Sequence, residues 1–85
     1  MMNMEVILYT KEECGLCQKA KKLLQELKTE YVFDLKEINI YEDEQLLEKY
    51  HLMIPVVEIE GEEVEYGTIH KDVIINSIIR AIRVE

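Results

Sequence analysis

The segment covering residues 4–40 constrains the fold most, because its hydrophobic pattern changes period twice. Residues 4–9, Met-Glu-Val-Ile-Leu-Tyr, form a nearly continuous apolar run, which is typical of a buried strand. Residues 16–27 repeat apolar side chains at steps of three and four, which predicts a helix. Residues 32–40 alternate polar and apolar side chains and indicate a second strand. Strand, helix and strand in this order predict a βαβ unit with two parallel strands and a right-handed crossover.

The rest of the chain adds a helix, a hairpin and a last helix. Residues 42–50 begin with acidic residues and have a lysine near their end, which suits a short helix and its dipole. Residues 55–59 and 63–66 predict two strands joined by a Glu-Gly turn. Isoleucines at helical spacing over residues 74–82 predict the last helix. The predicted order is βαβαββα, an α/β fold.

Length and composition predict one domain covering residues 1–85. A net charge of −8 argues against a nucleic-acid partner, because phosphate binding needs a basic face. The apolar runs fall far short of the roughly 20 residues that span a bilayer, and no signal-peptide pattern opens the chain, so we expect no membrane partner. Two cysteines are too few for a disulfide-stapled secreted scaffold. We therefore expect a cytoplasmic protein.

The acidity is concentrated in the predicted hairpin. Five glutamates crowd into residues 58–65: Glu58, Glu60, Glu62, Glu63 and Glu65. They indicate either a solvated strand face or an acidic docking surface for a basic partner.

The only two cysteines form a Cys-Gly-Leu-Cys segment between the first predicted strand and the first predicted helix. The positive end of the helix dipole favours a thiolate at Cys14, whereas Cys17 lies on the apolar stripe one turn further on. Thiol–disulfide exchange needs an accessible attacking thiolate and a second thiol that resolves the mixed disulfide. The pattern predicts Cys14 as nucleophile and Cys17 as resolving cysteine. Gly15 would let a partner approach closely, and Leu16 would offer it an apolar surface.

Three other interpretations of the cysteine pair stay open. Two core cysteines could fall three residues apart by chance. Structural zinc needs four ligands, and His51 and His70 lie 34 and 53 residues beyond Cys17, at no familiar ligand spacing, so no metal is expected. A purely structural disulfide across so short a loop would constrain the unfolded chain little.

Two segments resemble the glutaredoxin family. Residues 9–17, Tyr-Thr-Lys-Glu-Glu-Cys-Gly-Leu-Cys, resemble its active-site segment, with a lysine three residues before the first cysteine. Residues 54–56, Ile-Pro-Val, resemble its second signature, which contains a cis-proline. The resemblance covers the whole chain in element order, and the cysteine segment is similar to that of small bacterial glutaredoxin-like proteins with Cys-x-Leu-Cys. It implies a thioredoxin-like (glutaredoxin) fold, a four-stranded mixed sheet with helices on both faces.

The resemblance also implies roles for residues outside the cysteine pair. Lys11 would bind a glutathione carboxylate or hold Cys14 as a thiolate. Pro55 would be the cis-proline, and the backbone of Ile54 would pair with an incoming peptide or tripeptide.

One part of the family pattern is missing. Many glutaredoxins have a Gly-Gly pair before the last helix that holds the γ-glutamyl end of glutathione, and this chain has Gly67-Thr68 in that region. Thr68 could cap the last helix and offer N–H groups to a carboxylate, which would make a weaker glutathione site.

The first functional hypothesis is a small monomeric dithiol oxidoreductase without a bound cofactor. It would act on a disulfide of a protein or a small molecule, and glutathione or a reductase would reduce the resulting Cys14–Cys17 bridge. One alternative is a binding module that holds an iron–sulfur cluster between two subunits through Cys14, with glutathione as co-ligand. The other is a redox-inert adaptor that uses the glutamate-rich hairpin as its contact surface.

Overall fold

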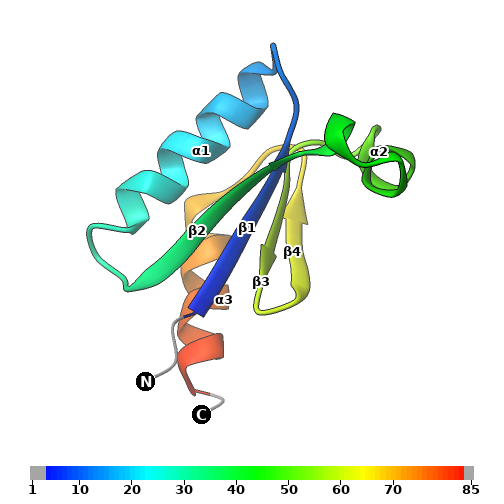
Figure 1. Cartoon of the computed structure of the whole chain (residues 1–85). Coiled ribbons are helices and arrows are strands. Elements are labelled where there is room, and N and C mark those ends of the chain that lie inside the picture. The colour runs from blue at the N-terminus through cyan, green and yellow to red at the C-terminus, as the bar shows by residue number, and fades with distance from the viewer. Residues whose placement is uncertain (1–3, 84–85) are drawn as a thin grey trace.

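The computed structural model describes residues 4–83 and contains a four-stranded sheet with three α-helices (Figure 1). The elements follow in the order β1 (Met4–Thr10), α1 (Gly15–Leu27), β2 (Phe33–Asn39), a 3-10 helix η1 (Ile40–Glu42), α2 (Glu44–Tyr50), β3 (Val56–Ile59), β4 (Glu62–Tyr66) and α3 (Lys71–Arg83). The predicted order βαβαββα is confirmed, with η1 as an addition. None of the helices within residues 4–83 is both long and apolar enough to cross a membrane.

The strands lie in the order β2-β1-β3-β4. β1 is parallel to β2, which confirms the βαβ prediction, and β3 pairs antiparallel with both β1 and β4. Tyr9 is opposite Val56, so the carboxyl end of β1 lies beside the start of β3. Because β4 then runs in the same direction as β1, the chain leaves both strands at one end of the sheet to enter α1 and α3.

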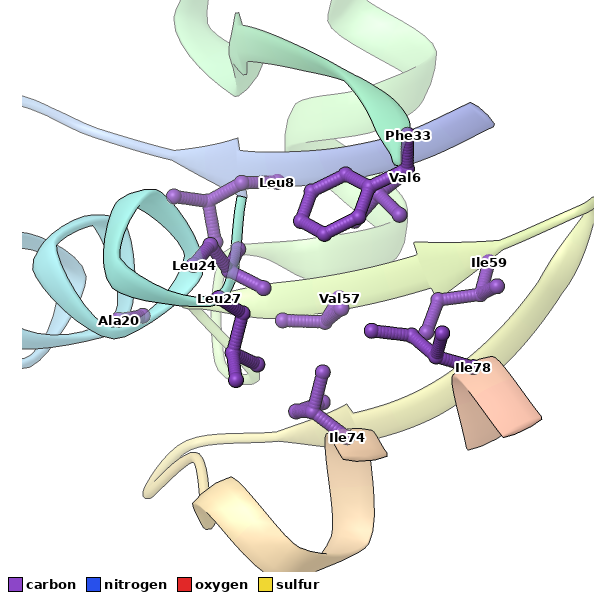
Figure 2. Packing of buried hydrophobic residues seen from close by; sticks show 10 residues of the cluster. All are labelled: Val6, Leu8, Ala20, Leu24, Leu27, Phe33, Val57, Ile59, Ile74 and Ile78. Carbon is purple, nitrogen blue, oxygen red and sulfur yellow. The ribbon is translucent and has the colours of Figure 1, made fainter. Parts of the chain in front are cut away.

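Helices cover both faces of the sheet, as predicted. Val6 and Leu8 point to the face covered by α1 and α3, and Ile7 and Tyr9 point to the face covered by α2, because successive side chains of a strand alternate. Figure 2 shows the larger cluster, in which side chains of α1 and α3 meet over the central strands. Its buried members are Val6, Leu8, Ala20, Leu24, Leu27, Phe33, Val57, Ile59, Ile74 and Ile78.

The ends of several elements differ from the sequence-based prediction. Val32 is 86% exposed and precedes β2, where it has no core to pack against. The second helix starts two residues later than expected, because the Asp43 side chain accepts the N–H groups that open α2. The last helix starts at Lys71, with the His70 carbonyl accepting the Ile74 N–H, so the expectation that Thr68 caps it is wrong.

Two of the hairpin glutamates bind tyrosines on the α2 face. The Tyr9 hydroxyl donates to Glu58 Oε1 at 3.0 Å, and the Tyr50 hydroxyl donates to Glu63 Oε2 at 2.5 Å. The two tyrosine rings lie 4.7 Å apart, and Lys49 Nζ lies 3.2 Å from Glu63. Burial, and then the carboxylate it faces, raises the pKa of each tyrosine, so both hydroxyls remain donors. Glu63 remains exposed, as the expectation of a solvated strand face requires, but both glutamates also bind tyrosines.

Candidate functional site

The cysteine pair opens helix α1. Cys14 and Cys17 form a disulfide, with Cα atoms 5.2 Å apart. Cys14 is the N-cap of α1: its carbonyl accepts the Gln18 N–H at 3.1 Å, and its Sγ accepts the Cys17 N–H at 3.1 Å. A sulfur at this position therefore receives a backbone donor and the positive end of the helix dipole, which stabilise negative charge on it.

The two sulfurs differ in environment, as the helical register predicted. Cys17 is only 3% exposed and lies on the buried face of α1 with Ala20, whereas Cys14 is half-buried. Leu16 is 43% exposed and lies between the two cysteines in the chain. Gly15 has room around it, since a Cβ there would meet no atom within 4 Å, and its backbone conformation does not require glycine. A partner sulfur can thus reach Cys14 far more easily than Cys17.

The turn into the cysteine pair is made by Glu13. Its φ of 53° lies in the left-handed region, which costs a residue other than glycine about 1 kcal/mol. This turn joins the extended strand β1 to the start of α1. Sequence reasoning missed it, because glutamate is not a residue whose presence indicates a left-handed turn.

The loop before β3 lies at the same end of the sheet as the cysteine pair. The Ile54–Pro55 peptide bond is cis, as predicted. The Gly67 N–H donates to the carbonyl of Pro55 at 2.8 Å and is also 3.1 Å from that of Met53. Gly67 has a φ of 77°, a conformation that favours glycine. The structure thus brings Ile54, Pro55 and Gly67 together, and the Gly67 N–H is already engaged within the protein.

Lys11 lies on the β2 side of the residues that lead into the cysteine pair. It lines an open cavity of about 400 Å³ with Glu12, Glu13, Asn39 and Tyr41, at the carboxyl ends of the parallel strands β1 and β2. The predicted site residues therefore form two groups, with Lys11 on the β2 side and the proline loop on the β3 side. Two carboxylates, Glu12 and Glu13, follow Lys11 directly in the chain and line the same cavity, so they offset its positive charge there.

A pair that sequence reasoning missed joins Glu65, in β4, to His70, which directly precedes α3. Glu65 Oε1 accepts the backbone N–H of His70 at 2.7 Å, and Glu65 Oε2 lies 2.5 Å from His70 Nδ1. The hydrogen bond to Glu65, and then its charge, raises the pKa of His70. Thr68 itself is exposed. In the sequence, the signals for this pair are the separation of five residues between Glu65 and His70 and the glycine at position 67 between them.

Replacing Glu65 by glutamine should lower the pKa of His70, because the neutral amide no longer stabilises the imidazolium. A raised folded-state pKa stabilises the fold while His70 is protonated, and this contribution is lost as the pH rises through that pKa. An NMR titration of the His70 ring protons in the wild type and in Glu65→Gln measures the shift. Identical titration curves would contradict the pairing.

Within residues 4–83 no group of three or more His, Cys, Asp or Glu side chains is arranged to hold a metal ion. The two histidines considered as zinc ligands have separate partners. His51 Nδ1 lies 3.1 Å from the Leu47 carbonyl at the end of α2, and His70 pairs with Glu65. The structure does not bring either histidine together with the cysteine pair as a ligand set.

Comparison with known proteins agrees with this geometry. A family model described as "Glutaredoxin-like domain (DUF836)" matches residues 5–79. A protein of Nitrosomonas europaea, solved in solution by NMR, is 28% identical over 92% of this chain and 94% of its own, with a TM-score of 0.80.

More distant solved structures share the fold. A protein of X. campestris is 21% identical over 88% of this chain and 96% of its own, with a TM-score of 0.74. Thioredoxin 1 of Thermosipho africanus is 18% identical over 94% of this chain and 96% of its own, with a TM-score of 0.70. The sheet and its three helices are thus thioredoxin-like.

Proposed function

Because the chain belongs to the family of glutaredoxin-like domains, we propose that it is a dithiol thiol–disulfide oxidoreductase. Cys14 is the attacking residue and Cys17 the resolving residue. The observation that carries this assignment is the unequal environment of two bonded sulfurs at one helix start. The half-buried Cys14 Sγ accepts a backbone N–H, and Cys17 is buried beside it. The proposed setting is the cytoplasm, where a disulfide of this kind is transient rather than structural.

The reaction has two exchange steps. In the first, the Cys14 thiolate attacks one sulfur of the substrate disulfide, a mixed disulfide forms, and the other substrate sulfur leaves as a thiolate and takes a proton. In the second, Cys17 loses its proton and attacks Cys14 Sγ, which forms the intramolecular disulfide and releases the second substrate thiol. The substrate gains two electrons and two protons, and the protein dithiol loses them.

The residues around Cys14 would hold the substrate. Leu16 and Ile54 offer apolar contact on either side of the attacking sulfur, and Gly15 leaves space for the approach. The hydrogen bond from the Gly67 N–H to the Pro55 carbonyl supports the Ile54 backbone at the end of the sheet. Lys11 adds a positive charge on the β2 side.

A redox titration of the cysteine pair tests the proposal. The protein is equilibrated in thiol–disulfide buffers of graded potential, and the loss of two hydrogens on bridge formation is read by mass spectrometry. Glutathione buffers set the higher potentials and dithiothreitol buffers the lower ones. We expect reversible titration between about −120 and −270 mV, the range of disulfide oxidoreductases, and above the roughly −300 mV below which structural disulfides lie. A pair that stays oxidised below that limit, or that forms no bridge at any potential, would contradict the proposal.

A further inference from the structure

Glu65 places an internal carboxylate at the start of α3. It accepts the His70 backbone N–H and pairs with the His70 ring, and its side chain is only 16% exposed. Helix N-termini attract anions, because their N–H groups and the helix dipole both point toward the ligand. In this protein the anion at that end is the protein's own, and Asp72 in the first turn of α3 adds a second carboxylate.

This carboxylate lies at the same end of the molecule as the cysteine pair. β1 and β4 run in the same direction and α1 and α3 follow their carboxyl ends in the chain. In Figure 1 α1 begins above the sheet, whereas the chain after β4 turns back so that α3 begins behind it. The Gly67 N–H, two residues after Glu65, donates to the Pro55 carbonyl beside the end of β1. Glu65 is opposite Val57 and Val57 is opposite Leu8, so Glu65 lies two strands across the sheet from the end of β1 that leads to Cys14.

The other flank of the cysteine pair is also acidic. Glu12 and Glu13 directly precede Cys14, and Lys11 is the cation that faces them in the cavity on the β2 side. The net charge of −8 for the whole chain adds a long-range repulsion of anions at low ionic strength.

We propose that Glu65 is a specificity-determining residue that disfavours anionic thiols, glutathione among them, as reductants of the Cys14–Cys17 disulfide. The inference rests on the proposed oxidoreductase function. It identifies the preferred reductant by its charge, as a thiol that is neutral or cationic where it contacts the site.

The reductive half-reaction shows why charge matters twice for a monothiol. The first reductant thiolate attacks Cys14 Sγ, and Cys17 leaves as a thiolate and is protonated. A second reductant thiolate then attacks the reductant sulfur of the mixed disulfide, and Cys14 leaves. Two reductant thiols become one disulfide, and the protein gains two electrons and two protons. Glutathione, whose carboxylates outnumber its amino group, meets the acidic site in both steps.

The test measures how fast three small thiols of different charge reduce the disulfide, with mass spectrometry as readout. The thiols are glutathione, neutral 2-mercaptoethanol and positively charged cysteamine, used at low ionic strength near pH 8 and again near pH 10. At the higher pH the His70 imidazole is neutral in both proteins, so loss of its proton cannot offset the charge that the substitution removes. Comparing each variant with the wild type cancels the intrinsic reactivity of each thiol. We expect Glu65→Gln to raise the glutathione rate relative to the mercaptoethanol rate by about threefold or more, as removal of one nearby charge allows.

Glu63→Gln is the matched control. It removes the same charge from the same strand, but its carboxylate binds Tyr50 on the opposite face of the sheet. An unchanged rate ratio in Glu65→Gln, or an equal rise in both variants, would overturn the role of Glu65. A disulfide that no thiol reduces in the wild type would instead overturn the proposed function. Wild-type protein gives an independent check, because added salt should narrow the gap between cysteamine and glutathione; an unchanged gap would also contradict the inference.

Discussion

Replacing Cys14 by serine should abolish reaction with disulfides, with a loss of at least about a thousandfold, since the attacking group of a covalent mechanism is removed. Cys17 cannot substitute for it, because that sulfur is 3% exposed. The measurement is a single turnover of reduced protein with hydroxyethyl disulfide, a small neutral substrate, followed by mass spectrometry. The wild type should lose two hydrogens, and Cys14→Ser should stay unchanged.

Cys17→Ser is the informative partner variant. Its Cys14 should still attack at a rate close to that of the wild type, but the mixed disulfide should persist as a stable adduct, because no second thiol resolves it. Thermal unfolding of both serine variants in the reduced state separates chemistry from folding. Full activity in Cys14→Ser, or a stable adduct on Cys17 instead of Cys14, would reverse the assigned roles.

Leu24→Ala should lower the free energy of unfolding by about 2–5 kcal/mol, the usual cost of a leucine-to-alanine cavity in a core. Leu24 is fully buried in α1, within the cluster that joins α1 and α3 across the sheet (Figure 2). Small domains are stable by only about 5–15 kcal/mol, so this single change removes a large share. Urea denaturation measures it as a shift of the midpoint at constant slope.

Leu52→Ala provides a control with identical chemistry. Leu52 is 87% exposed in the turn after α2, so its truncation should change stability by less than about 0.5 kcal/mol. Equal losses in the two variants would mean that the cluster around Leu24 does not form the core.

The parts of the fold that sequence predicted are those encoded by local periodicity. The helical step over α1 identified that helix and also distinguished Cys17 from Cys14, because one residue falls on the buried stripe and the other precedes it. The alternation in β2 and the Glu-Gly turn between β3 and β4 were equally local. Family resemblance supplied the cis peptide bond at Pro55, which no periodicity could have indicated.

The parts that sequence missed depend on contacts between distant segments. Glu58 binds a tyrosine 49 positions away, and only the insertion of β3 beside β1 brings the two together. The left-handed turn at Glu13 is set by the need to lead β1 into α1, against the preference of glutamate itself. In the sequence Glu65 does not differ from the neighbouring glutamates, and only its hydrogen bond to His70, just before α3 begins at Lys71, distinguishes it.

The two outer strands, β2 and β4, have a consequence for how copies of this protein behave in a crowded solution. Unpaired strand edges invite a second chain to add its own strand, which is a common start of aggregation. Here β2 carries Asp34, Lys36 and Glu37, and β4 carries three glutamates within five residues. Two molecules meeting through their β4 edges would bring like charges face to face, at a cost that rises as ionic strength falls. We therefore expect the acidic hairpin to oppose association of two molecules through their β4 edges. Two of its glutamates also accept hydrogen bonds from Tyr9 and Tyr50 within the fold.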